Sequence, residues 1–291
     1  MMEQGRLLKG IGSFYEVLTD AGDRVTCKAR GVFRLEKITP TVGDLVLIER
    51  QSSGYASLSQ ILPRKNLFVR PAVANIDQLF IVISASIPAP DWLLADRMII
   101  QAITNHVVPI PVLNKIDTQS DSITEQFRKD YQAFTTCITS AQTGEGVEHL
   151  RQLLGRKTSC FAGQSAVGKS SLLNALFPDL CLETGALSKK TEHGRHTTRH
   201  AELWPIDGAA VLDTPGFSFY DTECPDQDTL NACYPEFEKA SPCRYPDCKH
   251  LREPDCGVKA LLDTGDLTEA RYERYSIISG EFEMRRKHRY D

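Results

Sequence analysis

Residues Gly163 to Ser171 read GQSAVGKSS and match the spacing G-x-x-x-x-G-K-S of a phosphate-binding loop. In such a loop, consecutive backbone N–H groups surround the phosphates of a nucleotide, and the following helix points the positive end of its dipole at them. Lys169 would reach the β- and γ-phosphate oxygens, and the Ser170 hydroxyl would ligate Mg²⁺. The predicted phosphate-binding residues are Gly163, Gln164, Ser165, Ala166, Val167, Gly168, Lys169, Ser170 and Ser171.

A second group of polar residues would select the base. Asn114-Lys115-Ile116-Asp117 directly follows an apolar run, and the Asp117 carboxylate can accept hydrogen bonds from N1–H and the 2-amino group of guanine. Adenine offers neither donor in that arrangement, so Asp117 would choose guanine. Asn114 would tie the loop together, and the Lys115 stem would cover the base. After the next predicted strand comes Ser140-Ala-Gln-Thr-Gly144, where the Ala141 N–H could contact the guanine O6. Taken alone, N-K-x-D is equally compatible with a plain turn.

Two further segments would sense the γ-phosphate and its Mg²⁺. The segment Gly194-Arg-His-Thr-Thr-Arg199 lies in a polar stretch typical of a mobile loop, where Thr197 or Thr198 would complete the Mg²⁺ shell. The residues leave that choice open and favour Thr198. Asp213 would hold Mg²⁺ through water, and the Gly216 N–H would bind the γ-phosphate.

Phe217 follows the D-T-P-G segment, at the position where Ras-type enzymes have a glutamine that orients the attacking water. Phenylalanine cannot orient water by hydrogen bonding, so intrinsic turnover should be slow. His196 is the candidate to orient the water, with Lys169 as the catalytic cation, although a single loop histidine is often a bystander. Some GTPases hold K⁺ with an asparagine in the phosphate loop. Ala166 stands at that position, which leaves potassium activation open.

A cluster near the C-terminus has the composition of a zinc site. Cys243, Cys248, His250 and Cys256 lie within a short, proline-rich stretch. Three thiolates and an imidazole make a closed tetrahedral Zn²⁺ site without an open position, so the predicted metal is structural. Cysteines that cluster by chance are the alternative.

The elements that position these residues fall into three predicted domains. Residues 1–67 show short alternating runs broken by Gly, Pro and Asp, which favours an OB-type β-barrel. In residues 68–222, strands alternate with helices, and the polar segments follow the strands, as in an α/β P-loop GTPase domain. Residues 223–291 carry the zinc cluster and two helices, at about 258–262 and 268–287.

Composition and charge narrow the class of protein. The chain has 291 residues, 25% of them charged, and no apolar run long enough to span a membrane or to serve as a secretion signal. We therefore expect a cytoplasmic protein. Residues 1–70 contain 11 Lys and Arg against 7 Asp and Glu, so the N-terminal segment is basic although the whole chain has a net charge of −4. A basic barrel suits RNA binding; a barrel used only for protein contacts, or an ordinary solvated surface, is the alternative.

The order of the motifs is permuted relative to Ras-like GTPases, since N-K-x-D and S-A-x-T-G precede the phosphate loop and D-T-P-G. Together with the barrel and the Cys-Cys-His-Cys cluster, this order resembles the RsgA family of circularly permuted GTPases over essentially the whole chain. The resemblance implies a cytoplasmic, monomeric GTPase that binds the small ribosomal subunit, through 16S rRNA and ribosomal proteins, late in its assembly. It also implies stimulation by that subunit, release after hydrolysis of GTP to GDP, one zinc ion, and Mg²⁺ with GTP.

Two other functions remain open at this point. One is a GTP-dependent RNA-binding tether with negligible hydrolysis, which Phe217 keeps possible. The other is a GTPase that acts on a non-ribosomal RNA such as tRNA.

Overall fold

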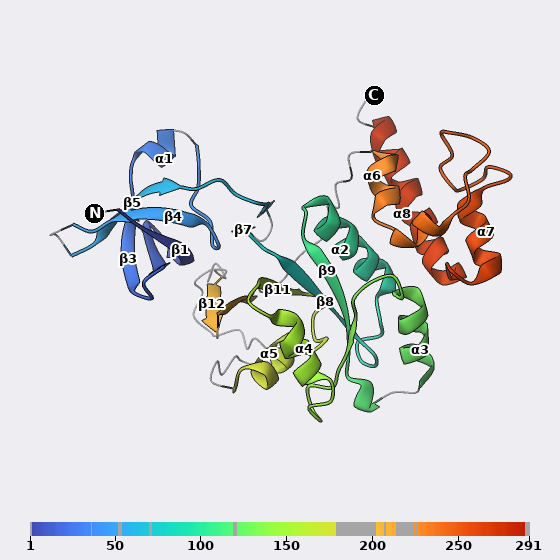
Figure 1. Ribbon diagram of the computed structural model, residues 1–291, viewed down its shortest axis with the longest axis horizontal. Helices are drawn as coiled ribbons and strands as arrows, with labels where there is room; N and C mark the ends of the chain where they lie inside the picture. The colour runs from blue at the N-terminus through green and yellow to red at the C-terminus, as the bar shows by residue number, and fades with distance from the viewer. Residues whose placement is uncertain are drawn as a thin grey trace, which may run out of the picture.

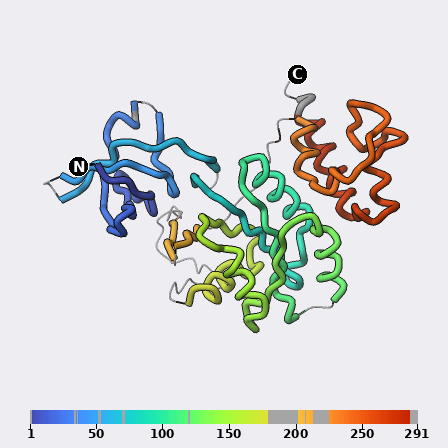
Figure 2. The backbone as a smooth tube through the Cα atoms, in the orientation of Figure 1, coloured from blue at the N-terminus to red at the C-terminus, as the bar shows by residue number. Residues whose placement is uncertain are grey.

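The computed structural model of the protein describes residues 2–35, 37–51, 54–69, 72–118, 121–178, 202–206, 208–213, 224 and 226–288. Three units follow one another along the chain: a barrel, a central sheet covered by helices, and a helical C-terminal unit (Figure 1). The N-terminus lies at the barrel and the C-terminus at the opposite unit, as the tube in Figure 2 shows. The predicted fold class is confirmed.

Five strands form the barrel, and the short helix α1, Val32–Leu35, connects the third strand to the fourth. The strands are β1 Met2–Ile11, β2 Phe14–Thr19, β3 Arg24–Ala29, β4 Leu45–Glu49 and β5 Ala56–Ile61. Strand β1 pairs with both β2 and β4, and β5 pairs with both β3 and β4, which closes the ring. Leu7, Val17, Cys27, Val46 and Leu58 are buried in its interior.

The barrel differs from the sequence prediction at its first hairpin. The alternating run from Gly10 to Leu18 suggests one strand, but the chain turns between β1 and β2 at Gly12, where φ is +62°. Strand β1 carries little sequence signal because a register shift between Leu7 and Lys9 buries the adjacent residues Leu7 and Leu8 together. Such a bulge breaks the period-two pattern by which strands are predicted.

The segment after the barrel is held by polar contacts. Arg64 donates two hydrogen bonds to the buried carboxylate of Asp44, of 2.7 and 2.8 Å. The Asn66 side chain bonds to both the N–H and the C=O of Ile76. The small hairpin between these contacts consists of β6 Leu67–Val69 and β7 Ala72–Ala74.

The central sheet has the order β10-β9-β8-β11-β13-β12, with every pairing parallel except that of β12 with β13. Its strands are β8 Gln78–Ser84, β9 Val108–Asn114, β10 Cys137–Ile138, β11 Thr158–Ala162, β12 Glu202–Ile206 and β13 Ala209–Asp213. Its helices are α2 Trp92–Thr104, η1 Ile116–Thr118, α3 Asp121–Asp130, α4 Val147–Leu154 and α5 Lys169–Leu176.

Strand β8 explains why the sheet has two covered faces. Every residue of β8 is buried, because alternate side chains enter two different cores. Leu79, Ile81 and Ile83 face the core that contains α2 and Phe127 of α3, whereas Phe80 and Val82 face the core that contains α4 and α5. Asp91 caps the N-terminus of α2, since its side chain accepts a hydrogen bond of 2.9 Å from the Leu94 N–H.

The two prolines of β9 are tolerated in the sheet because of where their missing N–H groups would point. Residue Val108 donates its N–H toward β8, and Leu113 accepts a bond from β10, so residues 109 and 111 face β10. Strand β10 begins only at Cys137, opposite Val112. The prolines therefore remove hydrogen bonds at positions where β9 has no partner strand.

Strand β12 joins the barrel to the central sheet and was not predicted. It runs antiparallel to β13 and meets β1 at the pair Lys9 and Glu202, whose side chains form an ion pair of 2.7 Å. Pro205 within this short strand obscures its pattern. As a result, one continuous sheet passes from the barrel through β1 and β12 into the central unit.

The C-terminal unit consists of α6 Gln227–Ala232, η3 Pro235–Lys239, α7 Gly257–Thr264 and α8 Glu269–His288. Its α8 packs against α2 of the central unit through charged side chains. Arg271 and Arg274 of α8 contact the buried carboxylate of Asp96 on α2, at 2.5 and 2.6 Å. Arg274 also pairs with Asp130 at 3.0 Å, and Arg271 with Glu236 at 3.1 Å. Among the described residues, no helix is both long and apolar enough to cross a membrane.

Candidate nucleotide-binding site and candidate zinc centre

The phosphate loop joins β11 to α5 and depends on two glycines. At Gly163, with φ +143°, a Cβ would lie 2.2 Å from the Val82 carbonyl oxygen. At Gly168, with φ +98°, a Cβ would lie 2.4 Å from Asn114 Nδ2. A side chain at either position would clash, so the loop can pass this close to its neighbours only as glycine. Helix α5 begins at Lys169 and directs its N-terminus at the loop.

Asn114, at the end of β9, holds the predicted loops together. Its Nδ2 donates a bond of 2.9 Å to the carbonyl of Val167 in the phosphate loop. Its Oδ1 accepts bonds from the Ala141 N–H, at 3.2 Å, and from the Thr139 hydroxyl, at 3.3 Å. The Asn114 side chain is 1% exposed, so these bonds form out of water. Three loops that are far apart in sequence therefore meet at one side chain.

Asp117 lies beside the loop that begins at Ser140. Its Oδ1 accepts a hydrogen bond of 2.5 Å from the Ser140 hydroxyl, whose oxygen accepts the Thr143 N–H at 3.1 Å. The bond holds one carboxylate oxygen, so the orientation of the carboxylate is set before any base arrives. Thr139 was not among the predicted site residues, because a threonine at the end of a strand carries no distinguishing signal.

Two lysines cross the mouth of the phosphate loop. Lys169 Nζ donates to the carbonyls of Gly163 and Gln164, both at 2.8 Å. Lys115 Nζ reaches the carbonyl of Ala166 at 2.7 Å and that of Ile87 at 2.6 Å. The Lys115 stem thus spans from the Asn114–Asp117 loop to the phosphate loop. Both ammonium groups lie where an anion bound by the loop would meet positive charge.

Strand β13 brings Asp213 to the same edge of the sheet. Leu212 is in register with Cys160 of the neighbouring parallel strand β11, so Asp213 is level with Phe161, two residues before Gly163. The predicted residues His196, Thr197, Thr198, Gly216 and Phe217 lie outside the described part of the chain, as does the side chain of Asp213.

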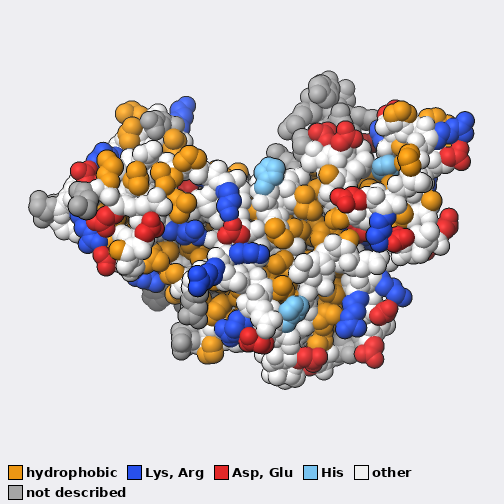
Figure 3. Space-filling model, in the orientation of Figure 1, with side chains coloured by type: hydrophobic (Ala, Val, Ile, Leu, Met, Phe, Trp, Pro, Cys, Tyr) orange, Lys and Arg blue, Asp and Glu red, His pale blue; other side chains and the backbone are white. Residues whose placement is uncertain are grey.

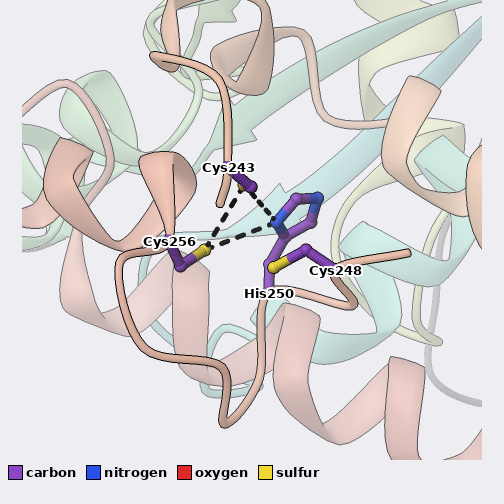
Figure 4. A group of neighbouring side chains, drawn as sticks. All are labelled: Cys243, Cys248, His250 and Cys256. Carbon is purple, nitrogen blue, oxygen red and sulfur yellow. Dashed lines mark hydrogen bonds between the residues drawn. The ribbon is translucent and has the colours of Figure 1, made fainter. Parts of the chain in front are cut away.

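The cysteine and histidine cluster comes together in the C-terminal unit, as Figure 4 shows for all four side chains. The potential ligand atoms of Cys243, Cys248, His250 and Cys256 all lie within 4.8 Å of one another. The sulfurs of Cys243 and Cys256 are 3.9 Å apart and lie 3.5 and 3.4 Å from His250 Nδ1.

These separations match the geometry that zinc requires. Tetrahedral Zn²⁺ with bonds of about 2.3 Å to sulfur and 2.0 Å to nitrogen places sulfurs about 3.8 Å apart and a sulfur about 3.5 Å from the nitrogen. The donor set of three sulfurs and one imidazole nitrogen also suits this metal. The residues present therefore fit a structural zinc ion.

The start of α7 assists the cluster electrostatically. Burial alone would raise the pKa of Cys243, but hydrogen bonds from the backbone amides of Gly257 and Val258 lower it. Burial raises the pKa of Cys248 to about 12. A thiolate at Cys243 is the form that ligates metal, whereas Cys248 needs the metal's own charge to lose its proton.

Relatives of known name match nearly the whole chain. Residues 4–57 match the family profile described as RsgA N-terminal domain, and residues 61–223 match the one described as RsgA GTPase. The chain is 41% identical to a small ribosomal subunit biogenesis GTPase RsgA of Caldanaerobacter subterraneus, with 99% of this chain and 98% of that protein covered. It is 38% identical to the protein of the same name from Agathobacter rectalis, with 98% and 99% covered.

Solved structures agree with these matches. The crystal structure of YjeQ from Thermotoga maritima superposes with a TM-score of 0.82 at 33% identity, covering 97% of this chain and 98% of that one. The structure of YloQ, a circularly permuted GTPase, superposes with a TM-score of 0.80 at 34% identity, covering 98% and 96%.

Proposed function

The chain belongs to the RsgA GTPase family, and from this premise we propose that it hydrolyses GTP in late assembly of the small ribosomal subunit. The nucleotide part of the proposal rests above all on Asn114, through which the base-reading loops and the phosphate loop meet. The ribosomal part is supported by relatives that carry that name and match this chain along nearly their full length. The proposal includes a cytoplasmic location for the protein, where it would meet the assembling small subunit.

Each side chain at the edge of the sheet has a proposed task. The phosphate loop binds the phosphates, Lys169 exchanges its carbonyl partners for β- and γ-phosphate oxygens, and Ser170 ligates Mg²⁺. Asp117 keeps one carboxylate oxygen on Ser140 and offers the other to the guanine edge. For the residues outside the described part of the chain, the proposal stays as the sequence suggests: His196 orients water, Thr197 or Thr198 and Asp213 serve Mg²⁺, and the Gly216 N–H binds the γ-phosphate.

The barrel is the proposed RNA-binding unit, and the proposed domain limits are 1–67, 68–222 and 223–291. In Figure 3 the barrel and the C-terminal unit rise as two lobes with a hollow between them. Lys and Arg side chains gather over the seam between the barrel and the central unit in the same view. Positive charge beside a hollow suits the phosphate backbone of a folded RNA.

The test of the proposed function is GTP turnover measured with and without isolated small ribosomal subunits. We expect slow release of phosphate by the protein alone and a strong increase when small subunits are added, but not when large subunits or tRNA are added. Absence of stimulation by small subunits would favour the tether, and stimulation by tRNA would favour the other RNA substrate.

Base recognition can be tested by Asp117→Asn. The amide replaces an acceptor with a donor at the guanine edge, so kcat/KM for GTP should fall by about 100-fold or more while turnover of xanthosine triphosphate rises. Asp121→Asn, an exposed residue at the start of α3, is the matched control and should leave base choice unchanged. A mutant at Asp117 that still prefers GTP would contradict the assignment.

The proposed zinc ion can be tested by elemental analysis of the full chain. We expect one zinc ion per chain, retained by Cys224→Ser and lost by Cys248→Ser, because Cys224 lies outside the cluster. Two small apolar cores stabilise the C-terminal unit, so loss of the metal should also reduce its helix content, measured by circular dichroism. Full zinc content in the Cys248 variant would rule out this ligand set.

A further inference from the structure

The edge of His250 that faces away from the cysteines contacts Asn231 of α6. Asn231 Nδ2 lies 3.2 Å from His250 Nε2, while Nδ1 points at the sulfurs of Cys243 and Cys256. The ring of Phe237 lies edge-on to the imidazole at 5.5 Å between centroids. The Tyr272 hydroxyl donates a bond of 2.7 Å to the His250 carbonyl. His250 is thus held at its backbone carbonyl by Tyr272, at its ring by Phe237 and at Nε2 by Asn231.

The contact with Asn231 suits only one of the two neutral forms of the imidazole. With Nδ2 as the donor, Nε2 must accept, so the ring proton sits on Nδ1, against the sulfurs. A metal at Nδ1 needs that lone pair, which moves the proton to Nε2. Nε2–H and the Asn231 NH₂ group would then be two donors facing each other. Metal-bound histidines generally donate their second N–H to an oxygen, and the Asn231 side chain has one, Oδ1, on its opposite side.

We propose that Asn231 positions His250 for zinc by turning its amide, so that Oδ1 accepts the Nε2–H when Nδ1 binds the metal. This inference rests on the zinc site proposed above. The amide group keeps its shape when it is turned by 180°, so the change needs no space. The turn does require that the hydrogen-bond partners of Asn231 accept an exchange of the positions of Oδ1 and Nδ2.

The side chains around Asn231 can exchange donor and acceptor roles. The Tyr275 hydroxyl lies 2.8 Å from Asn231 Oδ1 and 2.8 Å from the Lys249 carbonyl, and it has one proton to donate. After the turn, this hydroxyl donates to Lys249 and accepts from Asn231 Nδ2. Tyr275 is therefore satisfied in both arrangements.

Gln227 completes the network by turning in the same way. Its Nε2 lies 3.1 Å from Asn231 Oδ1, and its Oε1 accepts a bond of 3.2 Å from the Ser279 hydroxyl. With its own amide turned, Gln227 accepts from Asn231 Nδ2 and donates to Ser279, whose hydroxyl can take either role. Gln227 Nε2 also donates a bond of 2.9 Å to the Tyr275 hydroxyl, so after both turns this hydroxyl faces two acceptors, Gln227 Oε1 and the Lys249 carbonyl, with one proton. One of these two contacts is lost on metal binding, and the other contacts of the network keep a donor and an acceptor. The network links the candidate ligand His250 to α6 and α8.

The test is zinc affinity of the full chain, measured by competition with a chromophoric chelator and Zn²⁺ itself as the probe. Asn231→Leu keeps the size of the side chain but removes the acceptor, and should weaken zinc binding by about 10- to 100-fold. Asn231→Asp keeps an acceptor and should bind zinc within about threefold of the unaltered protein or more tightly. Asp228→Leu, at an exposed position on the same helix, is the control and should not change the affinity.

The outcomes separate the possibilities. Asn231→Leu with unchanged affinity overturns the inference, and so does equal weakening by Asn231→Leu and Asn231→Asp, which would indicate packing alone. Zinc binding that is absent in the unaltered protein would instead overturn the zinc site itself. If Asn231→Leu does not fold, nitrogen-15 NMR of the zinc-loaded, unaltered protein decides. The expected spectrum has His250 protonated at Nε2 and metal-bound at Nδ1, and the reverse assignment would overturn the inference.

Discussion

We expect Lys169→Ala to lower kcat/KM for GTP by at least about 100-fold, because the ammonium group is the proposed partner of the β- and γ-phosphate oxygens. In the structure this group caps the phosphate loop through the carbonyls of Gly163 and Gln164. Lys115 Nζ lies at the carbonyl of Ala166 instead, so the truncated side chain leaves the carbonyls of Gly163 and Gln164 without their described cation. Phosphate release with saturating small subunits measures the effect where turnover is fastest.

A matched control is Lys129→Ala, which removes a lysine from the exposed side of α3, where it pairs with Glu125 at 3.4 Å. That variant should hydrolyse GTP at the unaltered rate. Fluorescence titration with a labelled GTP analogue then shows whether Lys169→Ala loses binding or turnover. A Lys169 variant with ordinary turnover would remove the phosphate loop from the proposed mechanism.

Asp96→Ala should lower the free energy of unfolding by about 3–5 kcal/mol. Asp96 has no exposed surface and faces two arginines of α8, so its loss leaves Arg271 and Arg274 buried beside too little negative charge. Burial alone would lower the pKa of Arg274, but the carboxylates of Asp96 and Asp130 raise it, and the group stays charged. Tyr131 also donates a bond of 2.8 Å to Asp96, and this bond is lost with the carboxylate.

Urea unfolding followed by tryptophan fluorescence measures this loss, because Trp92 begins α2 and lies 6.3 Å from the Tyr131 ring. The comparison variant is Glu125→Ala, which removes an exposed carboxylate of α3 and should change stability by less than about 0.5 kcal/mol. A loss below about 1 kcal/mol for Asp96→Ala would mean that the ion cluster does not join α2 to α8 energetically.

Elements with a strong local pattern were predictable from the sequence. The structure begins and ends α4 at Val147 and Leu154, β11 at Thr158 and Ala162, and β13 at Ala209 and Asp213, as the apolar runs indicate. Strand β12 and the first hairpin were missed, since a proline interrupts one and a bulge the other. A regular apolar pattern in a sequence indicates an element that buries one face along its length. Neither β12 nor the hairpin of β1 and β2 has such a pattern.

The contacts of the candidate site were predictable only in part. Glycine spacing and polar residues at strand ends pointed to the loops, because parallel strands bring their carboxyl ends to one edge. A tie within the Asn114–Asp117 loop was expected of Asn114, whereas its bonds to the phosphate loop, to Ala141 and to Thr139 were not. Asp96 and Arg274 could not have been paired from the sequence, because nothing in the residues between them specifies that α8 returns to α2.

The packing of α8 against α2 limits how far the chain can be truncated from its C-terminus. The N-terminal part of α2 lines a small pocket together with Gly163 and Gln164 of the phosphate loop, while Asp96 of the same helix faces α8. A fragment that stops before residue 224 would leave the carboxylates of Asp96 on α2 and Asp130 on α3 without their arginines. The GTP turnover of such a fragment would report a repelling pair of carboxylates rather than the native enzyme.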